Sequence, residues 1–453
     1  MGVSRELTTF DSMRSLLIGL LGAGALALTA CDGADDRTSA GPTIAPTPCG
    51  TVDGRGCAPP GKRVDLTRPS FSHSTSITNP LFPISRLRSV VLMGHVEGKP
   101  FRTETTLLPG ARTVAWNGER VAVLVSQYMA YLDGRLEEVA LDRYAQADDG
   151  SVWYLGEDVF DYRKGAIAFT EGTWLAGREG PGAMIMPARP EVGDVYRTEN
   201  APGIVFEEVT VRSVSETVPG PHGPVTGAMI ASELHSDGTR EDKLFAPGYG
   251  EFRTAGGGDL EALALAMPTD AREGSMPAEL GVLAAGSEGV LEAARLGNWE
   301  NAAFSIRRMN TAWKKLRAGH QPPRIAHRLS ATLTALTASV RARKSFRVEQ
   351  DAINVSQSVL DLQLQYRPPA EIDVARFHLW TQQVRVDAAA GDLDGVTGDV
   401  AVLEWIRDRI APSLGSARRD IDARLVELRA ATDARNLPAA ADHAARLGAR
   451  IRG

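Results

Sequence analysis

The spacing of hydrophobic and polar residues changes once along the chain. In the first half the two kinds alternate with a period of two, as along residues 101–105 and 124–128, which is typical of strands that bury one face. In the second half apolar residues recur every three or four positions, as along residues 325–340, which indicates helices with one buried stripe. The pattern predicts an α+β protein in two domains, with an antiparallel curved β-sheet over residues 63–268 and an all-α domain over residues 269–453.

Turn signals divide the first domain into strands. Three Asp-Gly pairs each separate two segments rich in Val, Tyr, Thr and Trp: Asp133-Gly134, Asp149-Gly150 and Asp237-Gly238. Asp-Gly favours the tight turn of a β-hairpin because both residues tolerate positive φ. No helical pattern of about ten residues stands out between Pro83 and Leu265. We therefore expect a meander of about eight to ten strands.

The helical domain is internally repeated. Prolines that head amphipathic stretches recur at intervals of 46, 46 and 43 residues: Pro277, Pro323, Pro369 and Pro412. A turn followed by an apolar residue recurs between them at intervals of 47, 47 and 44: residues 297–299, 344–346, 391–393 and 435–437. Proline suits the first turn of a helix, so the two markers predict about four helical hairpins. A stacked hairpin array and two four-helix bundles both satisfy this pattern.

The N-terminal segment resembles the signal of bacterial lipoproteins. Arg14 precedes an apolar run that starts at Leu16 and ends in Leu28-Thr29-Ala30-Cys31, and this ending resembles the lipobox. The run is shorter than the roughly 20 residues that span a membrane, as in a cleaved export signal. The resemblance implies a signal peptide over residues 1–30 and lipidation of Cys31. The protein is then expected to be exported and lipid-anchored to the cell membrane or outer membrane, facing the periplasm or the exterior.

Residues 31–62 are rich in Gly, Pro, Ser and Thr and poor in apolar residues, so we predict a flexible tether. Cys49 and Cys57 lie within it. Because an exported protein meets an oxidising compartment, these two cysteines are expected to form a disulfide. Two free surface thiols are the alternative. Neither their number nor their spacing suits zinc, which takes about four ligands, and no metal site is expected.

A second resemblance covers about residues 77–266. Five matching segments follow in order: residues 79–83, 142–157, 172–177, 186–196 and 243–250. They resemble a widespread group of uncharacterised secreted bacterial proteins, which implies a shared β domain and brings no known reaction. The chain departs from the group at Arg143 and at Phe206-Glu207-Glu208, so the resemblance carries no acidic site over to this chain.

The concave face of the sheet is expected to hold an apolar ligand, as in periplasmic lipoprotein carriers. Aromatic rings combine a large apolar area with a polar edge, and five of them are the proposed lining: Trp116, Trp153, Tyr154, Trp174 and Tyr196. The alternative is that these rings form the ordinary core of the sheet. Asp148 and Asp149 are interpreted as turn residues rather than calcium ligands.

The two halves of the chain carry opposite charge. Of the net charge of -6, residues 1–269 contribute -10 and residues 270–453 contribute +4. Between Asn301 and Val348 there are eleven Lys or Arg and no Asp or Glu. Such a patch attracts lipid headgroups, anionic envelope polymers or the acidic β domain, although a solvated helix face would show the same charges. The proposed anion-binding residues are Arg307, Arg308, Lys314, Lys315, Arg317, Arg341, Arg343, Lys344 and Arg347.

The sequence contains no Gly-x-Ser-x-Gly elbow, no paired-histidine zinc helix and no phosphate loop. We therefore expect a non-enzymatic envelope lipoprotein without cofactors, which binds an apolar ligand or an envelope protein through its β domain and uses the helical domain as a docking scaffold. One alternative is a structural lipoprotein whose basic helices hold an anionic polymer or membrane. Another is a hydrolase with an unrecognised motif. Nucleic acid is not an expected partner, since the protein is expected outside the cytoplasm and shows no nucleic-acid-binding motif.

Overall fold

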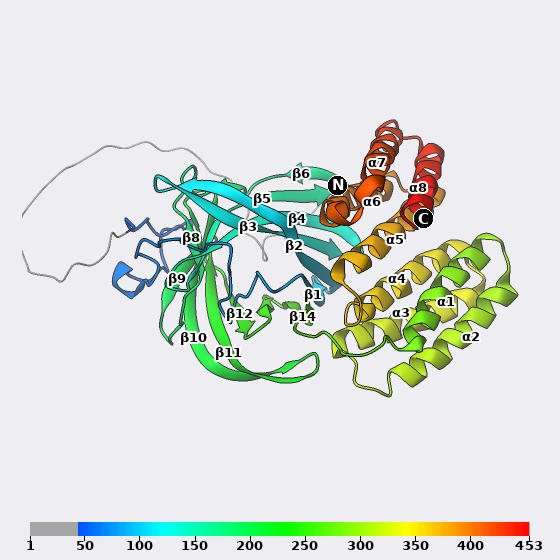
Figure 1. The fold of residues 1–453 in the computed structure, drawn as a ribbon, viewed down its shortest axis with the longest axis horizontal. Coiled ribbons are helices and arrows are strands. Elements are labelled where there is room, and N and C mark those ends of the chain that lie inside the picture. The colour runs from blue at the N-terminus through cyan, green and yellow to red at the C-terminus, as the bar shows by residue number, and fades with distance from the viewer. Residues whose placement is uncertain (1–43, 453) are drawn as a thin grey trace, which may run out of the picture.

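The computed structural model describes residues 44–452. A curved antiparallel sheet of 14 strands occupies the N-terminal part, and eight helices occupy the C-terminal part (Figure 1). The α+β class, the curved antiparallel sheet and the helical second domain are confirmed. The last strand ends at Met267 and the first helix begins at Ala278, on either side of the predicted domain boundary.

Most strands of the sheet pair with their neighbours in the sequence. Along the sheet the order is β6-β5-β4-β3-β2-β1-β14-β13-β12-β11-β10-β9, and β7 and β8 both pair with β5. The bounds are β1 Ser89–Val96, β2 Lys99–Trp116, β3 Glu119–Leu132, β4 Arg135–Gln146, β5 Val152–Arg163, β6 Ala166–Phe169, β7 Trp174–Leu175, β8 Ala183–Met186, β9 Val195–Ala201, β10 Val205–Gly220, β11 Gly223–His235, β12 Arg240–Ala246, β13 Gly250–Gly256 and β14 Asp259–Met267.

The sheet curls strongly. Strand β8 pairs with β5 near one end of the strand order and also contacts β9 at the other end. Bulges interrupt the pairing of several long strands, including β10 with β11 and β2 with β3, and bulges bend strands and increase their twist. The predicted number of strands was too low. Three of the strands, β6, β7 and β8, are only two to four residues long, too short to show an alternating pattern, and they account for most of the difference.

Tight turns connect the long strands. At Asp133-Gly134, between β3 and β4, φ is 49° and 81°, and at Asn117-Gly118, between β2 and β3, φ is 53° and 79°. Two successive residues at positive φ match the twist of the hairpin strands that they join. The predicted Asp-Gly turn at Asp133 is therefore present, and Asp149-Gly150 and Asp237-Gly238 likewise lie between consecutive strands.

The eight helices form two four-helix bundles, which resolves the alternative left open by the sequence. Helix α1 contacts α2 and α4 in the first bundle, and α5 contacts α6 and α8 in the second. The bounds are α1 Ala278–Arg295, α2 Trp299–Leu316, α3 Pro323–Ala342, α4 Ser345–Gln363, α5 Pro369–Ala390, α6 Leu393–Ile410, α7 Arg418–Asp433 and α8 Leu437–Arg452.

Both sequence markers of the helical repeat have structural counterparts. Pro323 and Pro369 start α3 and α5, and Pro277 is the residue before α1. The prediction fails at Pro412, which lies in a short 3-10 helix over Ala411–Ser413, ahead of α7, which begins at Arg418. The second marker coincides with the turn inside each hairpin, where the side chains of Asn298 and Asp392 cap α2 and α6. Each cap accepts a hydrogen bond from a backbone N–H in the first turn, which stabilises the start of the helix.

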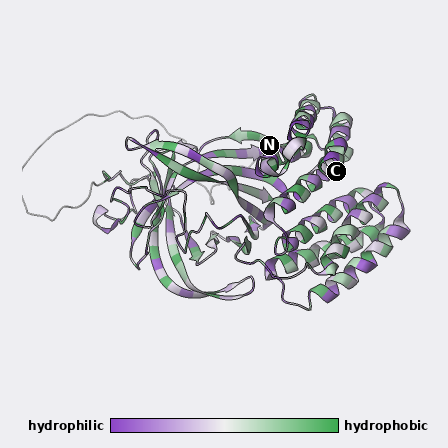
Figure 2. Cartoon of the chain, in the orientation of Figure 1, coloured by the Kyte–Doolittle hydropathy of each residue, from purple (hydrophilic) through white to green (hydrophobic). Residues whose placement is uncertain are grey.

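Both bundles bury apolar residues against the sheet. The first bundle shares a core with Val91 of β1 and Leu265 of β14. The second shares a core with Met129 of β3 and Val139 of β4. Hydrophobic and hydrophilic residues alternate along the long curved strands in Figure 2. Each of these strands therefore has an apolar face for such packing and a polar face on the other side.

Buried ion pairs join the helices to the sheet. Arg102 of β2 donates to Asp361 of α4 at 2.7 Å, and Arg409 of α6 donates to Glu104 of β2 at 2.6 Å. Arg376 of α5 lies between them and donates to Asp361 at 2.8 Å. Three arginines and three carboxylates make up this interface network: Arg102, Arg376, Arg409, Glu104, Asp361 and Asp373.

The segment preceding the sheet is fastened to it. Arg197 of β9 donates to the Pro48 carbonyl at 2.9 Å, and the backbone N–H of Ala58 donates to Glu208 of β10 at 2.7 Å. Cys49 and Cys57 form the predicted disulfide. The prediction of a flexible tether is therefore wrong for residues 44–62, because hydrogen bonds and the disulfide satisfy polar groups that a tether leaves to water. Residues 31–43 lie outside the described part of the chain.

Within residues 44–452, no helix combines the length and the apolar character needed to cross a bilayer. The proposed lipidation site, Cys31, lies outside the described residues.

Candidate functional site

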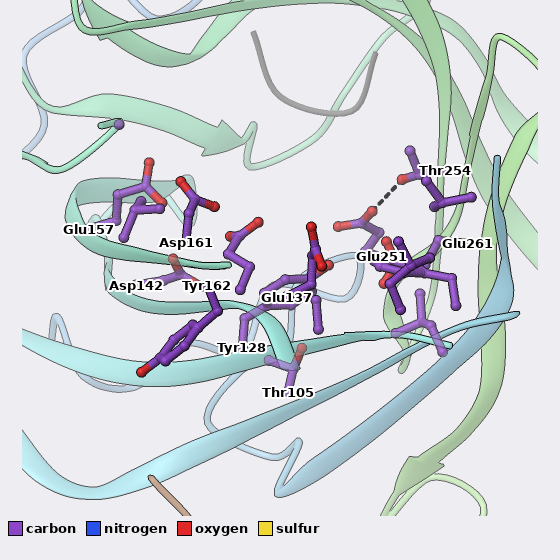
Figure 3. Close-up of a pocket in the computed structure, with 18 of the residues that line it drawn as sticks. Thr105, Tyr128, Glu137, Asp142, Glu157, Asp161, Tyr162, Glu251, Thr254 and Glu261 are labelled. Carbon is purple, nitrogen blue, oxygen red and sulfur yellow. Dashed lines mark hydrogen bonds between the residues drawn. The ribbon is translucent and has the colours of Figure 1, made fainter. Parts of the chain in front are cut away.

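The curled sheet and the start of α6 together line a partly open cavity of about 2640 Å³. Figure 3 shows side chains from opposite walls that point into it, with Asp142 and Glu157 on one side and Glu251 and Glu261 on the other. Seventeen of the lining residues are Asp or Glu, against five Lys or Arg and one His. The cavity is therefore strongly acidic, and field lines that are focused in such a space attract cations.

A cluster of charged residues forms one wall. Glu207 of β10 lies opposite His235 of β11 in the strand register, and Glu233 of β11 lies opposite Glu241 of β12. All four line the cavity. Two glutamates directly across a strand pair repel each other, so this arrangement requires nearby positive charge.

Lys243 supplies part of that charge. Its ammonium lies 3.3 Å from a Glu233 oxygen and 3.2 Å from a Glu241 oxygen. A third carboxylate, Glu251 of β13, lies 3.6 Å from the same nitrogen. Burial opposes the charge on Lys243, but the surrounding carboxylates outweigh it and raise the pKa of the ammonium well above its usual value. This wall of the cavity therefore already forms a cage for one amine.

The protonation states of the cluster differ from those in water. Burial, together with the nearby Glu207 carboxylate, raises the pKa of Glu233 to about 8. Burial also opposes the charge on His235, but Glu207 and Glu241 outweigh it and raise the pKa of the imidazole to about 10. Glu241 has a lowered pKa, since Lys243 and His235 overcome its burial. At neutral pH His235 is charged. The neighbouring carboxylates of Glu207 and Glu241 disfavour the ionised form of Glu233.

Three of these residues have the geometry of a metal site. The ligand atoms of Glu207, Glu233 and His235 lie within 4.8 Å of one another. A metal ion there would have to displace the proton that Glu207 and Glu241 hold on His235, and it would lie beside the Lys243 ammonium. Protonated His235 and the Lys243 ammonium therefore oppose a divalent ion at this position.

The opposite wall carries a second group of polar residues. The Tyr154 hydroxyl donates to Asp142 at 2.7 Å. Burial and the neighbouring Asp142 raise the pKa of Tyr154 well above its usual value, so its proton stays in place as a donor. Apolar side chains also line the cavity, among them Val90, Leu92 and Phe101. The cavity thus combines acidic and apolar surface.

Four of the five aromatic residues proposed as ligand contacts do not line the cavity. Trp116, Trp153, Trp174 and Tyr196 lie in a hydrophobic core, each less than 5 % exposed. Tyr154 alone among the five lines the cavity, and it also packs in that core. The rings pack against one another: the centroids of Trp116 and Trp153 lie 5.5 Å apart in a tilted arrangement, and Tyr154 meets Trp174 edge to face. Trp116, Trp153, Trp174 and Tyr196 therefore belong to the core of the sheet, as the alternative interpretation predicted, while Tyr154 keeps a place in the cavity lining.

The nine proposed anion-binding residues are all exposed on the first bundle, and none of them belongs to the interface network. Two other arginines of the same basic stretch turn towards the sheet instead. Arg324 donates to the Met93 carbonyl of β1 at 3.4 Å, and Arg328 is half-buried. The patch therefore divides into a part used for docking of the two domains and a larger solvent-exposed part.

Sequence reasoning missed the acidic cluster. Its residues occupy alternate positions on the strands, as Glu233 and His235 do on β11 and Glu241 and Lys243 do on β12. Alternating polar residues on a strand normally indicate a solvent-exposed face. The usable signal was that three strands in succession, β10, β11 and β12, each carry an acid, with Glu233 directly opposite Glu241. Repulsion disfavours such a pair on a solvated face.

Comparisons with known proteins give no further guide. No protein-family profile matches the chain, and no curated protein or solved structure shows significant similarity to it. The two resemblances noted in the sequence therefore stay predictions.

Proposed function

We propose that this chain is a lipid-anchored envelope protein that binds a cationic ligand in the cavity of its sheet and performs no chemistry on it. The observation that carries the proposal is the excess of carboxylates over cations in the cavity lining. Transfer of a cation into this space relieves repulsion among ionised acids, whereas transfer of an anion adds to it.

The cage around Lys243 indicates which cation fits. Side-chain oxygens of Glu233, Glu241 and Glu251 already surround one ammonium group at 3.2–3.6 Å. A ligand with a primary amine would meet the same kind of partner elsewhere on the acidic lining. The cavity exceeds the roughly 300–1,000 Å³ of ordinary small-molecule pockets, and Val90, Leu92 and Phe101 offer apolar surface. The proposed ligand class is therefore an amine that also has an apolar part.

Export and anchoring rest on the N-terminal sequence. The lipobox-like ending at Cys31 implies a lipid anchor, and the Cys49–Cys57 disulfide is consistent with an oxidising compartment. In this proposal the segment before the sheet connects the anchor to the β domain. The helical domain then serves as the scaffold that docks against other parts of the envelope.

The test compares two probes of equal length and opposite charge. The chain from residue 32, exported behind a cleavable signal, is titrated calorimetrically with decylammonium and with decanoate below their micellar concentrations. We expect decylammonium to bind at least about tenfold more tightly, the ratio that corresponds to 1.4 kcal/mol. Decanoate binding of equal or greater strength would contradict the proposal.

Variants then place the binding in the cavity. Glu251→Gln removes a charge from the lining, and we expect weaker binding of decylammonium. Glu216→Gln removes an exposed charge outside the cavity and serves as the matched control. An equal effect of the two substitutions would mean that decylammonium responds only to the overall charge of the protein.

A hydrolase is the second candidate, and one observation favours it. Glu233 has a raised pKa and the adjacent Glu241 a lowered one, and pairs of acids with pKa values pushed apart are typical of general acid–base catalysis. Both carboxylates, however, are engaged by Lys243. Turnover of chromogenic esters or glycosides that Glu233→Gln abolishes would favour catalysis over binding.

A further inference from the structure

The first helical bundle has one end attached to the sheet and one end far from it (Figure 1). Arg324 near the start of α3 reaches β1, and Asp361 near the end of α4 reaches Arg102 of β2. Because neighbouring helices run in opposite directions, the α1–α2 turn and the α3–α4 turn both lie at the other end. We call this end the distal tip and define it as residues 296–298 and 341–347.

The distal tip is basic and exposed. All seven residues from Arg341 to Arg347 are exposed, and four of them are cations: Arg341, Arg343, Lys344 and Arg347. Arg347 pairs with Asp351 at 3.2 Å. Among the described residues no ion pair involves Arg341, Arg343 or Lys344, so their charge is available to an external partner.

The distal tip also exposes large apolar side chains. Leu296 in the α1–α2 turn is 73 % exposed, and Phe346 beside Lys344 is 51 % exposed. A third such residue, Phe304, is 51 % exposed on the adjoining part of α2, with the guanidinium groups of Arg307 and Arg308 each 5.8 Å from its ring. Apolar residues that are exposed among cations keep their contact with water unless something covers them.

From this juxtaposition we infer that the distal tip docks on an anionic lipid bilayer. Cations at a membrane surface are attracted by acidic headgroups, and aromatic and aliphatic side chains enter the boundary between headgroups and acyl chains. The tip presents both kinds of residue within the same two turns. An anionic polymer would satisfy the cations alone and would leave Leu296 and Phe346 in water.

This inference is independent of the ligand proposed for the cavity. It also divides the basic stretch into two parts, because Lys314, Lys315 and Arg317 lie at the end of α2 that is near the sheet. Lys315 pairs with Glu279 there. These three residues carry the same charge as the unpaired cations of the tip without any exposed aromatic neighbour, which makes them a matched control.

The experiment is co-sedimentation of the exported chain from residue 32 with vesicles of 30 % phosphatidylglycerol and 70 % phosphatidylcholine, and with vesicles of phosphatidylcholine alone. We expect binding to the anionic vesicles and at least tenfold weaker binding to the neutral ones. The variant Arg341→Ala/Arg343→Ala/Lys344→Ala is expected to lose roughly 100-fold in partitioning, since each cation near an acidic surface contributes about fivefold. The control Lys314→Ala/Lys315→Ala/Arg317→Ala is expected to change it by less than fivefold.

Phe346→Ala distinguishes a bilayer from a polymer. It leaves the charge unchanged, and we expect it to weaken vesicle binding about tenfold because an inserted aromatic ring leaves water while binding to soluble polyphosphate stays the same. Circular dichroism of each variant checks that the bundle is folded. The inference is overturned by equal binding to both kinds of vesicle, by equal losses in the tip and control variants, or by polyphosphate binding without vesicle binding.

Discussion

The substitution Arg376→Met tests whether the interface network holds the sheet and the helices together. Arg376 is fully buried on α5 and lies 2.8 Å from Asp361, 3.2 Å from Asp373 and 3.3 Å from Glu104. Methionine fills much of its volume but carries no charge. The variant therefore keeps most of the packing and leaves three buried carboxylates with only two arginines.

The magnitude follows from the imbalance of charge. Removal of one partner from a buried ion pair costs about 3–5 kcal/mol, because the remaining charge is desolvated without compensation. Burial alone would disfavour ionised Glu104, yet Arg376 and its two companions lower the pKa of that carboxyl well below its usual value. We therefore expect Arg376→Met to lower the free energy of unfolding by about 3–5 kcal/mol.

Two further variants make the test specific. Arg376→Met/Asp361→Leu removes one charge of each sign, so two arginines face two carboxylates, and we expect a smaller loss than in the single variant. Arg407→Met removes a more exposed arginine that pairs with Asp422, and we expect a loss of less than about 1 kcal/mol. These free energies are measured by urea unfolding followed by circular dichroism. If Arg376→Met is as stable as Arg407→Met, the reasoning is refuted.

Three other outcomes follow from the structure. Glu233 has a folded-state pKa of about 8, above that of an unfolded glutamate, so its contribution to stability is present below about pH 4 and is lost as the pH rises towards 8. In thermal unfolding, Glu233→Gln should lose less stability over this pH range than the unsubstituted protein. An unchanged pH profile would contradict the assignment. Trp153→Ala should cost about 3–5 kcal/mol in urea unfolding, because the ring is 1 % exposed in the core, whereas a ligand-lining tryptophan would cost less. Cys49→Ser/Cys57→Ser should lower the free energy of unfolding by about 2–3 kcal/mol, the loop-closure estimate for a short loop, and should speed hydrogen exchange in residues 44–62. Unchanged exchange there would mean that the hydrogen bonds to the sheet hold this segment without the disulfide.

The hairpins were predictable because their signals are local. Asp133-Gly134 adopts the two positive φ values of a tight turn, and Asn298 and Asp392 cap helices at the predicted positions. Each of these residues acts on backbone groups within a few positions of itself. Such signals remain legible whatever the rest of the chain does.

The interface network could not be predicted in the same way. Arg409 and Glu104 are 305 residues apart in the sequence, and Arg102 and Asp361 are 259 apart. Each charge occupies a position that is also acceptable on a wet surface. The packing of the bundles against the sheet turns them into buried partners, and no local pattern records that packing. Opposite charge in the two halves indicated docking but not which residues would carry it.

The acidic cavity was hidden for a related reason. A strand that alternates apolar and polar residues looks the same in sequence whether its polar face meets bulk water or an enclosed space. The curl of the sheet decides between them, and it depends on bulges such as those between β10 and β11. Glu233 and Glu241 therefore appeared as solvated residues, and the ligand contacts were predicted at the large aromatic residues instead.

The charges of the two domains are only partly used in holding them together. Three arginines meet three carboxylates in the interface network, so this contact is balanced and consumes none of the excess in either half. The negative excess of the β domain gathers around the cavity, where Glu207, Glu233 and Glu241 are held inside the curled sheet. The positive excess of the first bundle lies on exposed surface that includes the distal tip. Because the distal tip lies at the end of the first bundle far from the sheet (Figure 1), its charge does not neutralise the acids of the cavity. Each excess therefore stays available for the partner proposed for it, an amine in the cavity and an acidic bilayer at the tip.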